Sequence, residues 1–228
     1  MSRVTGNLKE ARGKSLALCA NIMLNELDHE LERRGHSFVR YEDDMVIFCG
    51  SKATAEQTLE HIVPFIEKKL FLKVNREKTV VAYAGKIKFL GYGFYKGKKG
   101  FALRVHAKSK TKMKARVREL TSRRTVNDYE KWKVDLKRYV VGWVNYYKLA
   151  DMGAYLQSTD EWMRRRIRMV FWKKWKRVRT RWRNLLNLGI SNANAGILAN
   201  SRKGYWRIAS SPILQTAISN KKLEKGGF

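Results

Sequence analysis

Three acidic residues, Glu42-Asp43-Asp44, stand side by side between two apolar runs, and residues of this type and spacing can bind a metal ion. Adjacent carboxylates repel one another, so a cation would stabilise them at the end of a strand. Mg²⁺ prefers such oxygen ligands and leaves coordination positions for phosphate groups. Two such ions can stabilise both oxygens of a phosphoryl transfer. Asp43 and Asp44 are therefore candidate metal ligands, although an ordinary solvated turn can have the same sequence.

The segments around the acidic residues predict helices and short strands. The β-prone runs 38–41 and 45–49 on either side of them predict a hairpin. Before the hairpin, apolar residues recur every three or four positions from Leu16 to Leu31, which predicts a helix that ends at Gly35. A second helix over 55–66 should kink or restart at Pro64. Further strands are expected at 71–74, 79–83, 87–95 and 101–106, the last two joined by a turn at 97–100.

The net charge of +29 is divided unevenly along the 228 residues. Residues 1–100 hold 18 Lys and Arg against 12 Asp and Glu, whereas residues 101–228 hold 31 against 8, together with all seven Trp. Helical periodicity in this second half predicts helices over 108–123, 128–149 and 159–187, followed by loops and short helices beyond Gly189. The predicted fold class is α+β, with a nearly ordinary first half and a basic, helical second half.

The composition narrows the class of protein. The net charge argues against a soluble enzyme that acts on small metabolites, because repulsion between like charges opposes compaction of the chain. With 44% hydrophobic and 11% aromatic residues, the chain is too apolar for a disordered basic tail. Nucleic acid is the expected partner, and an anionic membrane surface is a distant second. No apolar run is long enough to span a membrane, and Cys19 and Cys49 indicate neither a disulfide framework nor a zinc site, so we expect a cytoplasmic protein.

The basic residues are densest between positions 164 and 183, where eleven of twenty residues are Lys or Arg. Neighbouring cations repel one another unless phosphates neutralise them, whereas the simpler alternative is a solvated helix face over an aromatic core. Trp172 and Trp175 could stack on bases or pack under arginine side chains. The predicted RNA-binding residues are Arg164, Arg165, Arg166, Arg168, Lys173, Lys174, Lys176, Arg177 and Arg179.

The run Tyr41-Glu42-Asp43-Asp44 resembles the Tyr-x-Asp-Asp hairpin of reverse transcriptases, and more specifically that of the group II intron reverse transcriptase/maturase family. The resemblance continues in family order through segments 20–28, 72–79 and 88–94. In the basic half, Gly142-Trp143-Val144-Asn145-Tyr146-Tyr147 and segment 160–166 resemble the family's thumb, also called the maturase-specific domain. Segments 200–207 and 211–214 resemble its C-terminal part.

The resemblance implies a palm remnant over residues 1–106 and a thumb or maturase-specific domain over 107–228. Asp43 would be a ligand of catalytic Mg²⁺ with Asp44 adjacent, and Tyr41 would lie near the primer end or the incoming nucleotide. Either Lys73 or Lys78 would approach the nucleotide phosphates. The partners would be intron RNA and a DNA primer or target. The implied primer-grip residues are Phe89, Leu90 and Gly91, followed by Tyr92.

The chain departs from the family pattern in its acidic residues. The family carries a further catalytic Asp on an earlier strand, which would lie upstream of Met1, and it usually has Ala where this chain has Glu42. We therefore expect this chain to be a truncated, C-terminal part of the enzyme that does not synthesise DNA alone. An N-terminal fragment could supply the missing part. The alternative is a non-catalytic RNA-binding maturase that assists intron folding and splicing. A basic ribosome-associated protein would explain the charge but not the acidic run.

Overall fold

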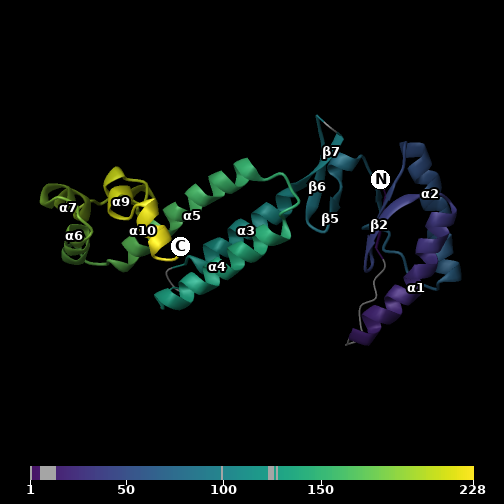
Figure 1. Cartoon of the computed structure of the whole chain (residues 1–228), viewed down its shortest axis with the longest axis horizontal. Coiled ribbons are helices and arrows are strands. Elements are labelled where there is room, and N and C mark those ends of the chain that lie inside the picture. The colour runs from purple at the N-terminus through teal and green to yellow at the C-terminus, as the bar shows by residue number, and fades with distance from the viewer. Residues whose placement is uncertain (1, 6–13, 99, 123–125, 127) are drawn as a thin grey trace. The chain divides into compact units, whose positions relative to one another are not determined.

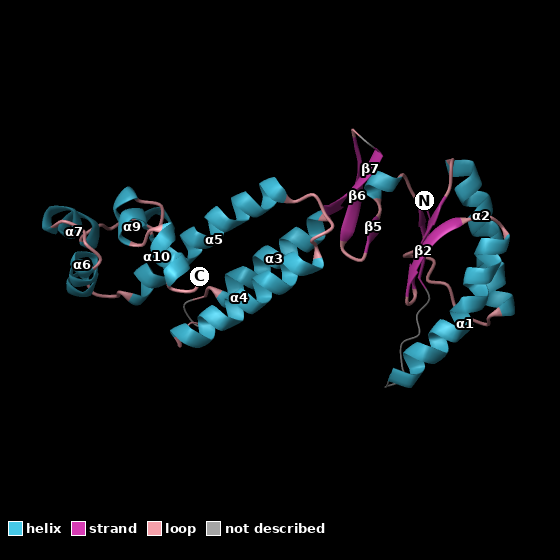
Figure 2. Cartoon of the chain, viewed as in Figure 1, coloured by secondary structure: helices cyan, strands magenta, loops and turns pink. Residues whose placement is uncertain are grey.

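The structure, a computed structural model, describes residues 2–5, 14–98, 100–122, 126 and 128–228, with side chains from Leu18 onward (Figure 1). The chain divides into two compact units, Met1–His106 and Ala107–Phe228. Among the described residues, all strands belong to the first unit, and the second unit is helical (Figure 2). The predicted α+β class is therefore confirmed.

The first unit is built on a four-stranded sheet with the order β2-β3-β1-β4, in which all neighbouring strands are antiparallel. Helices α1 and α2 cover the same face of this sheet, because Leu27 of α1 and Ile62 of α2 share one core with Met45 and Ile47 of β3. The elements are β1 (Ser2–Thr5), α1 (Lys14–Arg33), β2 (Ser37–Tyr41), β3 (Asp44–Phe48), α2 (Lys52–Pro64) and β4 (Val80–Val81).

The predicted ends of both helices are confirmed. Gly35 has φ 70°, and the N–H of His36 donates to the carbonyl of Leu31 while that of Gly35 donates to Glu32. This pair of bonds is the Schellman motif, which satisfies the last carbonyls of α1. At the end of α2, Pro64 is followed by one π-helical turn, η1 (Phe65–Lys69), as the missing N–H of a proline favours.

The strand predicted at 71–74 is wrong, because this segment closes the preceding helical turn instead. Phe71 has φ 55°, and the N–H of Leu72 donates to the carbonyl of Ile66. The strand predicted at 79–83 is reduced to the two residues of β4. A short 3₁₀ turn, η2 (Ala84–Lys86), follows it.

A second, three-stranded antiparallel sheet completes the first unit, with the order β5 (Lys88–Phe89), β6 (Tyr92–Gly97) and β7 (Gly100–Val105). The single strand predicted over 87–95 is wrong, because Leu90 and Gly91 both have positive φ, 48° and 84°, and form a two-residue turn between β5 and β6. The hairpin of β6 and β7 was predicted correctly, although Lys99 in its turn lies outside the described residues.

The second unit consists of helices around one aromatic core. The helix predicted over 159–187 is wrong, since the chain breaks at 175–177, between α5 and α6. The helices predicted over 108–123 and 128–149 are present as α3 and α4, and residue 123 lies outside the described residues. The elements are α3 (Ala107–Leu120), α4 (Tyr129–Tyr146), α5 (Gly153–Lys174), α6 (Val178–Asn187), α7 (Asn192–Ala199), α8 (Tyr205–Ile208), α9 (Pro212–Ala217) and α10 (Asn220–Lys225).

The tryptophans of the basic helix pack inside this unit. Trp172 is only 1% exposed and belongs to the same core as Trp132 and Leu185. Trp175 packs against that core from its edge, with its ring 6.0 Å from that of Trp172 in a T-shaped arrangement. Of the two alternatives for these rings, packing is therefore the one that the structure supports.

Candidate metal centre and candidate nucleic-acid interface

The acidic run forms the tip of the hairpin of β2 and β3. Tyr41 pairs with Asp44 across the strands, so the connecting turn consists of Glu42 and Asp43 alone. Glu42 has φ 53°, a conformation that favours glycine and costs a side-chain-bearing residue energy. Tyr41 is 57% exposed, Asp43 is exposed and Asp44 is half-buried. The three predicted catalytic residues, Tyr41, Asp43 and Asp44, thus lie together at the tip of one hairpin.

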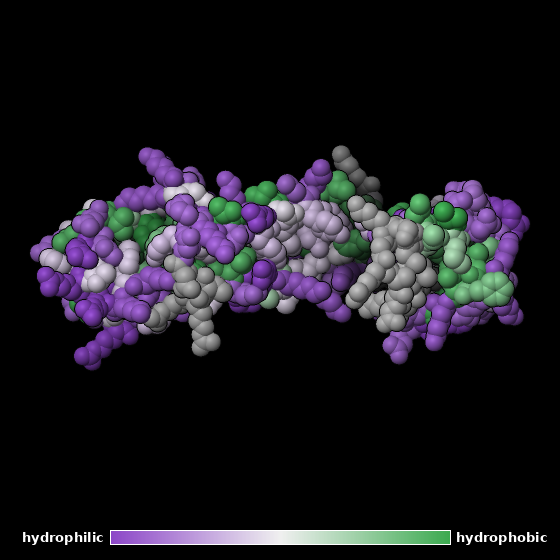
Figure 3. Space-filling model, turned by 90° about the horizontal axis from the view of Figure 1, so that it is seen from below, coloured by the Kyte–Doolittle hydropathy of each residue, from purple (hydrophilic) through white to green (hydrophobic). Residues whose placement is uncertain are grey.

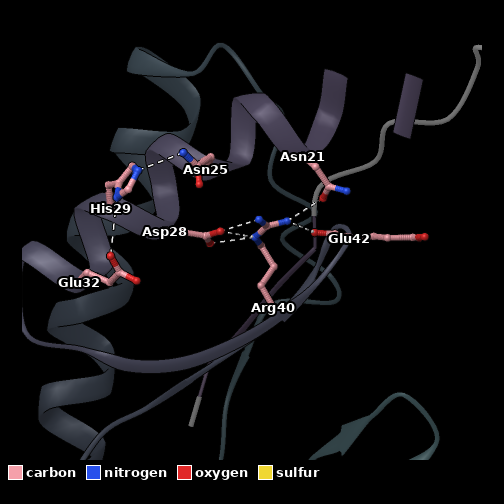
Figure 4. Close-up of polar contacts among 7 residues, drawn as sticks. All are labelled: Asn21, Asn25, Asp28, His29, Glu32, Arg40 and Glu42. Atoms are coloured by element: carbon pink, nitrogen blue, oxygen red, sulfur yellow. Dashed lines mark hydrogen bonds and ion pairs between the residues drawn. The ribbon is translucent and has the colours of Figure 1, made fainter. Parts of the chain in front are cut away.

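Arg40 ties this turn to α1, and Figure 4 shows its contacts. Its Nε donates to the Asp28 carboxylate at 2.8 Å, and its Nη2 donates to the same group. Its Nη1 donates to the side-chain oxygen of Asn21 at 3.0 Å and to the backbone carbonyl of Glu42 at 3.1 Å. The hydrogen bonds to Asp28 raise the pKa of Arg40 above its ordinary value. The clamp holds the strained residue of the turn in place.

The carboxylates present fit at most one magnesium ion. Among the residues that the structure describes, no group of three or more His, Cys, Asp or Glu could hold a metal. The strand beside β3 is β1, which brings Thr5 opposite Asp44 and has the sequence Ser2-Arg3-Val4-Thr5, without a carboxylate. Asp43 and Asp44 could hold one Mg²⁺ together with phosphate oxygens, but a pair of ions ~4 Å apart needs further ligands. The described residues therefore do not fit a two-metal centre.

The predicted substrate-binding residues lie on two other segments. Phe89, at the end of β5, has a buried side chain at 8% exposure, while Leu90 and Gly91 form the turn that follows. Lys73 and Lys78 are both exposed in the loop between η1 and β4. The sequence-based candidates of the first unit thus occupy two separate turns and one loop.

Four of the nine predicted RNA-binding residues have hydrogen-bond or ion-pair partners inside the described part of the protein. Arg164 forms ion pairs with Asp160 at 2.7 Å and with Glu224 at 3.2 Å. The guanidinium of Arg165 lies 4.0 Å from the ring centre of Trp206 and donates to its backbone carbonyl at 2.8 Å. These two arginines hold the C-terminal segment against α5.

Arg166 and Arg168 are engaged more deeply. Arg166 donates to the hydroxyl of Thr121 at 2.6 Å. Arg168 is only 7% exposed, and it donates to the carbonyl of Ile218 at 2.8 Å and to the side chain of Asn220 at 2.6 Å. Burial lowers the pKa of both arginines. Arg168 is therefore buried inside the helical unit. The hydrogen bonds of Arg166 and Arg168 connect α5 to other segments of this unit.

The remaining five predicted residues form the exposed part of the basic region. Lys173 and Lys174 are half-buried, whereas Lys176, Arg177 and Arg179 are exposed, and none of the five has a carboxylate partner among the described residues. We call these five residues the basic corner. No Asp or Glu occurs from 162 to 223, a stretch that holds sixteen Lys and Arg. On the face that Figure 3 shows, hydrophilic residues cover much of the helical unit.

None of the described helices combines the length and the apolar character needed to cross a lipid bilayer.

Two family models match the chain. The model described as Reverse transcriptase (RNA-dependent DNA polymerase) matches residues 15–94, which include the acidic turn and the turn at Leu90 and Gly91. The model described as Group II intron, maturase-specific domain matches residues 110–188, which include the basic corner. No curated protein matches the chain.

Proposed function

Because the chain belongs to the group II intron reverse transcriptase/maturase family, we propose that its helical unit binds intron RNA and assists folding and splicing of that RNA. The observation that carries this proposal is the basic corner, in which five cations lack carboxylate partners among the described residues. Structured RNA is recognised largely through its shape and its backbone, and an Arg- and Lys-rich surface suits that mode of binding.

The absence of acidic residues from 162 to 223 distinguishes this surface from an ordinary solvated helix face. A solvated face usually mixes both signs of charge, and α1 does so, with Glu30 paired to Arg33 and Arg34. In the basic corner, no described carboxylate offsets the repulsion between Lys173, Lys174 and Lys176. Phosphates of RNA would neutralise it while releasing counterions.

The second part of the proposal is that this chain alone does not synthesise DNA. Asp43 and Asp44 supply two adjacent carboxylates, and β1, the neighbouring strand, has none. Mg²⁺ at this turn would be held by Asp43 and Asp44, and a further carboxylate, supplied for example in a complex with a complementing palm fragment, would be needed to complete a two-metal site. Polymerase activity in such a complex is the alternative function, and it is favoured by the Arg40 clamp, which keeps the turn in one conformation.

The proposal is tested with a transcribed group II intron and three forms of the full chain. The unmodified chain and Asp43→Asn should bind the RNA with equal affinity, whereas the variant with all five residues of the basic corner changed to Gln should lose about 100-fold or more at low salt. A primer-extension assay on an RNA template with Mg²⁺ should give no product. RNA binding that survives the Gln substitutions would contradict the first part, and synthesis abolished by Asp43→Asn would contradict the second.

A further inference from the structure

A pocket of about 690 Å³ opens in the helical unit, between α6, the end of α7 and the loop that leads into α8. Its volume lies in the range of ~300–1,000 Å³ that is usual for small-ligand sites. The side chains that matter most are Trp172, Arg181, Arg202, Lys203 and Tyr205. The last three lie beyond residue 188, outside both matched segments, and sequence reasoning gave none of these residues a ligand-binding role except through possible stacking of Trp172.

Arg181 is held in a fixed position at this pocket. Its Nε donates to the carbonyl of Trp175 at 2.9 Å, and its guanidinium lies 4.8 Å from the ring centre of Trp172, which is itself buried. Its two Nη groups have no hydrogen-bond partner among the described residues, and Arg181 as a whole is half-buried. A guanidinium fixed on one edge and open on the other can bind a phosphate with little loss of entropy.

The other side of the pocket adds charge and an aromatic ring. Arg202 and Lys203 are exposed and have no ion-pair partner in the described part of the chain, and no acidic residue lines the pocket. Tyr205 is 43% exposed, and the ammonium of Lys173 lies 5.3 Å from its ring centre. The pocket therefore combines three cations with a partly exposed ring.

We propose that this pocket binds one unpaired nucleotide of an RNA strand, with the phosphate against Arg181, Arg202 and Lys203 and the base stacked on Tyr205. The proposal rests on the RNA-binding function proposed above. A paired base is enclosed by its duplex and cannot enter a pocket, whereas a base in a loop or bulge can be turned outward. Stacking on a tyrosine accepts any base, so the site selects unpaired RNA rather than a particular sequence.

The test measures binding of a short fluorescent oligouridylate to the full chain. The double variant Arg202→Ala with Lys203→Ala should bind about fivefold more weakly at ~0.1 M salt, and its slope of log affinity against log salt should be smaller by about 0.7, the value for one phosphate. The matched control removes two exposed cations of α4, Lys137→Ala with Arg138→Ala, and should stay close to the unmodified chain. Tyr205→Leu should lose roughly tenfold, and Tyr205→Phe should lose little.

A 4-thiouridine in the oligonucleotide should cross-link to the peptide that contains Tyr205, as identified by mass spectrometry. Equal losses in the pocket variant and the α4 control, or cross-links that avoid this peptide, would overturn the proposal. Thermal unfolding followed by tryptophan fluorescence shows whether each variant keeps its fold. The exposed residue Arg207, changed to Ala, provides a further comparison on α8 that removes a single charge. If the unmodified chain bound no RNA at all, the proposed function itself would fail, which is a separate outcome.

Discussion

Arg40 on β2 and Asp28 on α1 are twelve positions apart in sequence and form an ion pair in which two guanidinium nitrogens donate to one carboxylate. The same guanidinium reaches the carbonyl of Glu42, the turn residue with φ 53°. The pair is therefore the link through which the first helix supports the acidic turn. It is only 15% and 20% exposed, so water screens it less than the pairs on the helix surfaces.

Asp28→Ala should destabilise the first unit by about 1–3 kcal/mol, because Arg40 would lose the acceptor of its strongest hydrogen bonds. Hydrogen–deuterium exchange of residues 37–48 should become faster. The control is Glu56→Ala, which breaks the exposed Lys52–Glu56 pair and should change the stability by less than about 0.5 kcal/mol. If both variants left exchange in the hairpin unchanged, Arg40 would not be supporting the turn.

Phe71→Gly should stabilise the first unit by about 0.5–1 kcal/mol. Phe71 is 86% exposed, so its removal sacrifices almost no burial, and its φ of 55° is one that glycine adopts without strain. Phe71→Ala is the matched control, since alanine keeps the strain and should bring a smaller gain or none. Chemical denaturation monitored by circular dichroism compares the three chains. A lower midpoint for the glycine variant would show that the ring contributes a contact.

Glu30 should titrate far below its ordinary pKa of 4.5. Hydrogen bonds from Arg33, and then from Arg34, lower the pKa of this carboxyl to about 2. A carboxyl with a lowered pKa in the folded state stabilises the fold above its unfolded pKa, and this contribution is lost as the pH falls from about 4.5 to about 2. An NMR titration of the Glu30 carboxyl should show the low midpoint, and Arg33→Gln with Arg34→Gln should return it toward 4.5. An unshifted midpoint in the unmodified chain would contradict the pairing.

Arg168→Ala and Arg177→Ala should separate architecture from binding. Arg168→Ala should destabilise the helical unit by about 2–4 kcal/mol, because it leaves the carbonyl of Ile218 without its donor in the interior. Arg177→Ala should leave stability within about 0.5 kcal/mol and weaken RNA binding. Tryptophan fluorescence follows this unit selectively, since all seven Trp lie within it. The reverse pattern would mean that the two arginines have exchanged roles.

The parts of the fold that follow from local sequence were predictable. The hairpin at the acidic run, the end of α1 at Gly35 and the interruption at Pro64 each depend on a few neighbouring residues. The break between α5 and α6 carries no proline or glycine, and it is stabilised by the bond from Arg181 to the carbonyl of Trp175, which periodicity does not reveal. The left-handed conformation of Phe71 was not predicted, because a phenylalanine rarely adopts a positive φ.

The candidate sites divide in the same way. The acidic residues were identifiable because they are contiguous, whereas the Asp28–Arg40 clamp joins residues without any periodic relation. Among the basic residues, composition counts charge but cannot show which cations find acceptors fifty positions later, as Arg168 does at Ile218. One signal was available: Arg168 precedes the buried Trp172 by four positions, and residues at this spacing share a helix face. For the remaining cations, the sequence does show that their positive charge is not balanced locally, because no Asp or Glu occurs from 162 to 223.

Under the proposed function, the helical unit binds RNA through phosphate contacts made by the basic corner. The most direct measurement is the affinity of the full chain for a transcribed group II intron as a function of salt. If five phosphates are neutralised, affinity should fall by about 100-fold or more between ~50 and ~200 mM salt, and the variant with Gln at Lys173, Lys174, Lys176, Arg177 and Arg179 should have a much flatter slope. A flat response of the unmodified chain, or identical slopes for the two, would contradict the claim.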